Sequence, residues 1–140
     1  MAEYTYNPVQ LVNAGNGVIL NNNIPCSKGY VCHRQESGLV ILRGITSGTF
    51  ARYQVTFNGN IAVPEGGTAG PISLAIAVDG EPIPTSSAII TPAAVGEYGN
   101  VTSTAIITVP KGCCFAMTVE NTSTAAVNVQ NANLVVTRIA

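Results

Sequence analysis

This sequence has few charged residues: only 9% of its 140 residues are charged, and the net charge is −1. A protein that binds nucleic acid neutralises phosphates with a basic surface, and none is available here. We therefore expect no nucleic-acid partner. A weakly charged surface with a net charge near zero favours association. This composition predicts that copies of the chain cover much of the surface.

Long apolar segments are also missing. No run approaches the roughly 18 residues that a membrane helix requires, so we expect no membrane insertion. The opening stretch MAEYTYNPVQ carries an acid, Glu3, and lacks the basic and apolar regions of a secretory signal. We expect the chain to be made in the cytoplasm without a signal peptide.

Catalytic signatures are absent too. His33 is the one histidine, and no nucleophile motif such as G-x-S-x-G accompanies it. We expect His33 on the surface or at a subunit contact. Glycosidases need two acids facing each other across a cleft, whereas the acids here are scattered. We predict that the protein is not an enzyme and that it uses no cofactor.

Four cysteines are present, at Cys26, Cys32, Cys113 and Cys114. Without an export signal, thiols are expected to stay reduced, which favours structural and mostly buried thiols. A disulfide between Cys26 and Cys32 is one alternative. A metal site with His33 is another, although zinc sites use shorter cysteine spacings. Adjacent cysteines in a strand also point to opposite faces, so we expect no metal site.

Strand patterns dominate the rest of the chain. Helical periodicity is almost absent, and Thr, Val, Ile and Asn are abundant. In the stretch RYQVTFNGNIAV, the odd positions from Tyr53 to Phe57 are apolar, and the even positions from Arg52 to Asn58 are polar. This alternation predicts a strand with one face in the core and one face in solvent.

A hairpin is predicted at Asp79-Gly80, because a type I′ turn needs positive φ at both central residues. The return strand is expected over 83–91. Pro82 precedes this strand and Pro84 lies within it, and both prolines confine it to an edge or a bulge.

The last strand, VNVQNANLVVTRIA, changes parity midway. Val127 and Val129 occupy odd positions, whereas Leu134 and Val136 occupy even ones. A shift of one residue exchanges the two faces of a strand. We therefore predict a bulge within 131–133.

Together these patterns predict an all-β protein with about eight or nine antiparallel strands in a jelly-roll β-sandwich. The sandwich is expected over residues 26–140. Residues 1–25 form either an N-terminal arm or a first strand.

Three phrases carry a family resemblance: FNGNIAVPEGGTAGPISLAIAVDGEPI, TVPKGCCFAMTVENTST and NANLVVTRIA. The chain resembles, over roughly residues 38–140, the small jelly-roll domains of the tumour-necrosis-factor and complement-globular-head type. Such domains occur in bacteria and their prophages, including the C-terminal domains of collagen-like spore-surface glycoproteins. The resemblance implies a homotrimer with the final apolar strand near the threefold axis. The Gly-X-Y repeat of the collagen-like members is absent here.

The leading hypothesis is therefore a non-enzymatic structural protein that assembles as a homotrimer in a phage or prophage virion or another surface particle. Other structural proteins of that particle are possible partners, and its final location is the virion or cell surface. We predict the trimer interface at Phe115, Met117, Leu134, Val136 and Ile139.

The alternative is a module that binds a glycan or a receptor through the loops at 65–71 and 91–100. Carbohydrate-binding modules offer exposed aromatic rings, and Tyr98 lies in the second of these loops. The expected ligand residues are Glu65, Tyr98 and Asn100.

Overall fold

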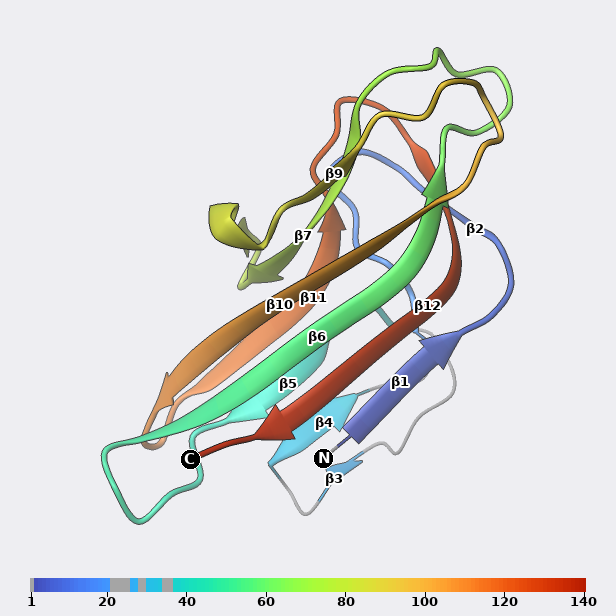
Figure 1. Cartoon of the computed structure of the whole chain (residues 1–140). Helices are drawn as coiled ribbons and strands as arrows, with labels where there is room; N and C mark the ends of the chain where they lie inside the picture. The colour runs from blue at the N-terminus through green and yellow to red at the C-terminus, as the bar shows by residue number, and fades with distance from the viewer. Residues whose placement is uncertain (1, 21–25, 28–29, 34–36) are drawn as a thin grey trace.

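The computed structural model describes residues 2–20, 26–27, 30–33 and 37–140. It is an all-β sandwich of two antiparallel sheets (Figure 1). The first sheet contains β1 (Ala2–Tyr6), β2 (Gln10–Val12), β6 (Phe50–Ala62), β10 (Gly99–Pro110) and β12 (Val127–Arg138). The second sheet contains β3 (Cys26–Ser27), β4 (Val31–His33), β5 (Val40–Arg43), β7 (Ile72–Val78), β8 (Glu81–Pro82), β9 (Ala88–Ile90) and β11 (Cys114–Asn121). The predicted jelly-roll sandwich is confirmed, with more strands than expected because five of them have only two or three residues.

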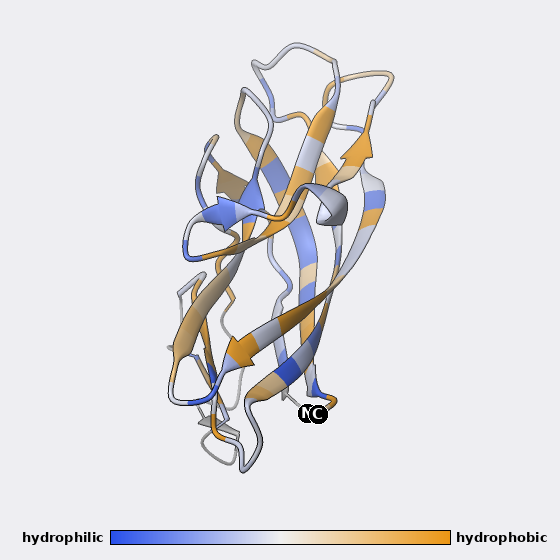
Figure 2. Cartoon of the chain, turned by 90° about the vertical axis from the view of Figure 1, so that its left-hand side faces the viewer, coloured by the Kyte–Doolittle hydropathy of each residue, from blue (hydrophilic) through white to orange (hydrophobic). Residues whose placement is uncertain are grey.

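The core lies between the two sheets and follows the predicted alternation. Tyr53, Val55 and Phe57 of β6 are buried, while Arg52 and Gln54 are exposed. Figure 2 shows the same alternation of apolar and polar residues along the long strands. Burying one face of every long strand supplies the main driving force for this packing.

β12 is an interior strand of the first sheet, which explains why its sequence is apolar. It pairs with β6 on one side and with β1 and β2 on the other. The predicted bulge is confirmed: the register with β6 shifts between Gln130 and Asn133, and Asn131 has a φ of 55°. Asparagine tolerates this left-handed conformation better than most residues.

The predicted hairpin at Asp79-Gly80 is also confirmed, with φ values of 51° and 85°. The return strand is interrupted: β8 pairs with β7, a short 3₁₀ helix (Pro84–Ser86) follows, and β9 pairs with β7 again. The two prolines supply no backbone N–H, so a continuous ladder cannot form there.

The sandwich has two distinct ends. The terminal end holds both chain termini, the β5–β6 loop (44–49) and the β10–β11 turn (111–113) (Figures 1 and 2). The loop end, opposite to it, holds the loops at 63–71, 91–98 and 122–126 (Figure 1). Within the described residues, no helix is long and apolar enough to cross a membrane.

Candidate functional site

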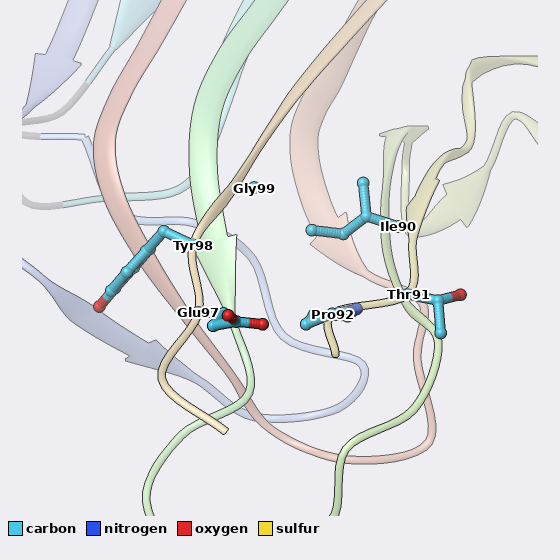
Figure 3. A pocket seen from close by; sticks show the side chains of 6 residues that line it. All are labelled: Ile90, Thr91, Pro92, Glu97, Tyr98 and Gly99. Carbon is cyan, nitrogen blue, oxygen red and sulfur yellow. The ribbon is translucent and has the colours of Figure 1, made fainter. Parts of the chain in front are cut away.

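A pocket of about 420 Å³ lies at the loop end, where the chain crosses from one sheet to the other. Its lining comes from the end of β9, the crossover loop and the start of β10, as Figure 3 shows. The lining residues are Ile90, Thr91, Pro92, Glu97, Tyr98 and Gly99. The volume lies in the range of small-molecule sites.

The crossover loop is held in place by backbone contacts. The N–H of Gly96 donates to the carbonyl of Val63 at 3.0 Å, which ties the loop to the end of β6. Gly96 has a φ of 82°, a conformation that favours glycine. At Gly99, a Cβ atom would lie 2.7 Å from Cδ1 of Ile90, so the absence of a side chain lets Ile90 form one wall.

The pocket presents one acid and one aromatic ring. The Glu97 carboxylate points toward Pro92, while the Tyr98 ring points away from Ile90 (Figure 3). Tyr98 is 43% exposed, which leaves its ring available for stacking. The carboxylate acceptor therefore faces the apolar wall of the pocket, while the ring offers its face to solvent on the other side of the loop (Figure 3).

The other two predicted ligand residues lie outside this lining. Glu65 is exposed in the neighbouring loop at 63–71. Asn100 is in β10, and its side chain belongs to the outer face of the first sheet. A second cavity of about 490 Å³ lies between the loops at 63–71 and 122–126, and small side chains form most of its walls.

Sequence reasoning did not identify a hydrogen-bonded row of asparagines on the outer face of the first sheet. We call this row the amide ladder: Asn7, Asn58, Asn60, Asn100 and Asn131. The Asn131 amide donates to Asn7 at 3.1 Å, and the Asn60 amide donates to Asn131 at 3.3 Å. The Asn100 amide donates to Asn60 at 3.2 Å and to Asn58 at 2.8 Å. The ladder therefore spans β12, β6 and β10.

Three residues predicted for a trimer interface lie instead inside the single chain. Met117, Leu134 and Val136 are all 0% exposed, because their positions face the opposite sheet. A fully buried side chain offers no surface to another subunit, so the assignment of these three is wrong. Phe115 is partly buried against the core and Ile139 is 45% exposed. For these two residues the interface stays a prediction.

His33 is buried rather than on the surface, which corrects the sequence-based expectation. Its ring lies 4.8 Å from the ring of Tyr4, so it joins the two sheets. Its Nε2 is 2.8 Å from the carbonyl oxygen of Ser37. Because a carbonyl only accepts, Nε2 carries the proton and donates. These contacts give His33 a structural role.

The expectation of buried free thiols is also wrong. Cys32 is disulfide-bonded, and the β3–β4 ladder places Cys26 directly opposite it. Cys113 and Cys114 are free but exposed, at the β10–β11 turn. Across the described part of the chain, no group of three or more His, Cys, Asp or Glu residues could hold a metal ion.

Comparison with known proteins supports the fold. No family model matches the chain, and no curated protein sequence matches it. The globular domain of zebrafish complement 1qA protein superposes with a TM-score of 0.60 at 13% identity, over 96% of this chain and 94% of that one. At this identity the likeness shows the fold alone. The implied complement-type fold is thus confirmed, while the bacterial or prophage origin stays a prediction.

Two carbohydrate-binding modules are more distantly similar. CsCBM6-3 of Clostridium stercorarium, solved with cellobiose, has a TM-score of 0.36 at 14% identity, over 97% of this chain and 88% of that one. The xylan-binding CBM22-1 domain of Paenibacillus barcinonensis Xyn10C has a TM-score of 0.36 at 10% identity, over 99% and 87%. Similarities this low carry no argument about function.

Proposed function

We propose that this chain is a non-enzymatic structural module that assembles as a homotrimer in a virion or another surface particle. The observation that carries the proposal is the outer face of the first sheet. On that face of β1, β6, β10 and β12, Glu3 and Arg52 are the only charged residues among those that the structure describes. Interface cores are depleted in charged residues in the same way.

The outer face also combines exposed apolar groups with polar groups that are already ordered. Ile106 and Ile139 are 59% and 45% exposed toward the terminal end of this face. Toward the loop end, the amide ladder fixes its own side chains through mutual hydrogen bonds. Association then costs less side-chain entropy, because these groups are held before a partner arrives.

The first test is the mass in solution by light scattering. A homotrimer has three times the 14.4 kDa of the chain, about 43 kDa. We expect Ile106→Glu to give a folded monomer, because the new charge would be desolvated at the interface. The matched control is Ile89→Glu, which places the same charge at a 65% exposed isoleucine on β9 of the other sheet. A wild-type monomer, or a trimer that survives Ile106→Glu, would contradict the proposal.

The particle assignment needs its own measurement. We expect the chain to copurify with virions or surface particles through a density gradient, in a constant ratio to their other proteins. Quantitative mass spectrometry across the gradient measures that ratio. A chain found only in the soluble fractions would contradict this location while leaving the trimer intact.

A second candidate function is favoured by the loop-end pocket, whose lining includes the Glu97 carboxylate, facing Pro92, and the exposed Tyr98, whose ring points away from Ile90 (Figure 3). A ring face and a carboxylate suit the apolar face and the hydroxyl groups of a sugar. A glycan array tests this reading with Tyr98→Ala. The matched control is Val95→Ala, an exposed residue of the same loop outside the pocket lining. Binding that survives Tyr98→Ala would refute this site.

A further inference from the structure

We infer that the loop-end pocket selects its ligand by charge, taking neutral or amine-bearing sugars and rejecting sugars that carry an acidic group. This inference rests on the second candidate function, glycan binding. It adds the class of sugar, and it assigns the selection to Glu97.

Charge is distributed unevenly between the two ends of the sandwich. Within the described residues, every lysine and arginine lies at the terminal end. Arg43 pairs with Cys114 at the start of β11, Arg52 and Arg138 lie on neighbouring strands there, and Lys111 is in the β10–β11 turn. An acidic ligand in the loop-end pocket would therefore find no described cation close to it.

The pocket itself carries an acid. Glu97 is part of the lining, and its carboxylate faces Pro92 (Figure 3). Glu65 adds a second exposed acid in the loop that is tied to the crossover through Val63 and Gly96. Glu97 repels a carboxylate or sulfate in the pocket, and Glu65 adds to the negative charge of the loop end. Neither has an ion-pair partner among the described residues that would offset this repulsion.

The Glu97 carboxylate also suits a neutral or amine-bearing sugar. A carboxylate only accepts hydrogen bonds, and a sugar ring offers hydroxyl donors that match it. An ammonium group at one of those positions makes the hydrogen bond charge-assisted, which is stronger. The exposed Tyr98 ring, which points away from Ile90 (Figure 3), offers a separate face for stacking on a sugar. The selection thus lies in Glu97 and the general affinity in Tyr98.

The size of the effect follows from Coulomb's law. Unit charges about 4 Å apart in a solvated site change an affinity by roughly five-fold. Because the pocket is open to solvent, added salt weakens the effect. We therefore expect the charge preference to be clear at low ionic strength and mostly lost at about 0.5 M salt.

The experiment uses three ligands that share one ring and differ in charge: the methyl glycosides of glucosamine, glucose and glucuronic acid. Binding to the full chain is measured by NMR titration near neutral pH. We expect the glucosamine glycoside to bind about five-fold more tightly than the glucose glycoside, and the glucuronic acid glycoside about five-fold more weakly. Glu97→Gln keeps the shape of the side chain and should bring the three affinities to within about two-fold. Glu81→Gln, at the distant β7–β8 hairpin, is the matched control and should change nothing.

The outcomes separate this inference from the function on which it rests. If the sugars bind and Tyr98→Ala abolishes binding, but Glu97→Gln leaves the order of affinities unchanged, the charge selection is overturned and glycan binding stands. If the acidic sugar binds best, the inference is likewise overturned. If none of the three sugars binds the wild-type chain, both the inference and the second candidate function are overturned.

Discussion

Leu134→Ala should strongly destabilise the single chain, because Leu134 belongs to its core. Leu134 is 0% exposed and lies on β12 between Tyr4 of β1 and Phe57 of β6, which are themselves buried. The change removes three buried carbon atoms, worth about 2.4 kcal/mol at roughly 0.8 kcal/mol each. The two aromatic neighbours are fixed by their ladders, so the cavity stays open and adds about 1 to 2 kcal/mol. The expected loss in the free energy of unfolding is about 4 kcal/mol.

The assay is urea unfolding followed by circular dichroism, at several protein concentrations, so that dissociation of an oligomer is recognised. Val135→Ala is the matched control, because Val135 is the next residue on the same strand and points to the outer face. It should cost less than about 1 kcal/mol. The reasoning is refuted if Leu134→Ala costs no more than the control, or if it changes only the mass of the assembly.

Individual contacts of Gly44, Asp79 and Tyr4 also contribute to stability. Gly44→Ala should cost about 3 kcal/mol or more in thermal unfolding, because the new Cβ would clash with the carbonyl oxygen of Pro110. Gly48→Ala should be almost neutral, because the nearest atom to its new Cβ, Oγ1 of Thr46, would lie 3.7 Å away. Asp79→Ala should cost about 1 to 2 kcal/mol in urea unfolding, since it removes both a carboxylate bond to a β11 backbone N–H and a residue suited to positive φ. Burial raises the pKa of the Tyr4 hydroxyl to about 12, above its usual 10.0. The stability from neutral Tyr4 is therefore complete below pH 10 and is lost toward pH 12, by up to about 1.4 kcal/mol per pH unit; Tyr4→Phe should remove this dependence, and an unchanged slope would contradict it.

The two proposed functions use different surfaces of the molecule. Assembly uses the outer face of the first sheet, while ligand binding uses the loop-end pocket between β9 and β10. Asn100 lies where they meet, one residue beyond the pocket lining and within the amide ladder. A trimer that buries the ladder would therefore leave the pocket at its rim. Three copies of a weak site would then act together on one multivalent glycan.

Sequence alone predicted the local features of the fold. The alternation around Tyr53 and Phe57, the hairpin at Asp79-Gly80 and the bulge at Asn131 all follow from the chemistry of neighbouring residues. Period-two patterning and positive-φ preferences act over a few residues, so they can be read before any partner strand is known.

Part of the candidate site could also be predicted from the sequence. The loop at 91–100 was expected to carry the ligand, and Tyr98 was recognised as its free aromatic ring. Glu97 and Ile90 were not recognised. The role of Ile90 depends on its contact with Gly99, across a crossover whose path the local sequence does not reveal.

Only the tertiary structure decided which residues meet and what covers the apolar face of each strand. Asn7 and Asn131 are 124 residues apart, yet they touch because β1 and β12 are neighbours in one sheet. Leu134 and Val136 have the apolar character of either an interface or a core, and their full burial assigns them to the core. The free energy gained by burying an apolar side chain depends on the area removed from water, and not on whether its own chain or another subunit covers it. The sequence therefore determined which strand faces exclude water, and the pairing of distant strands determined what covers them.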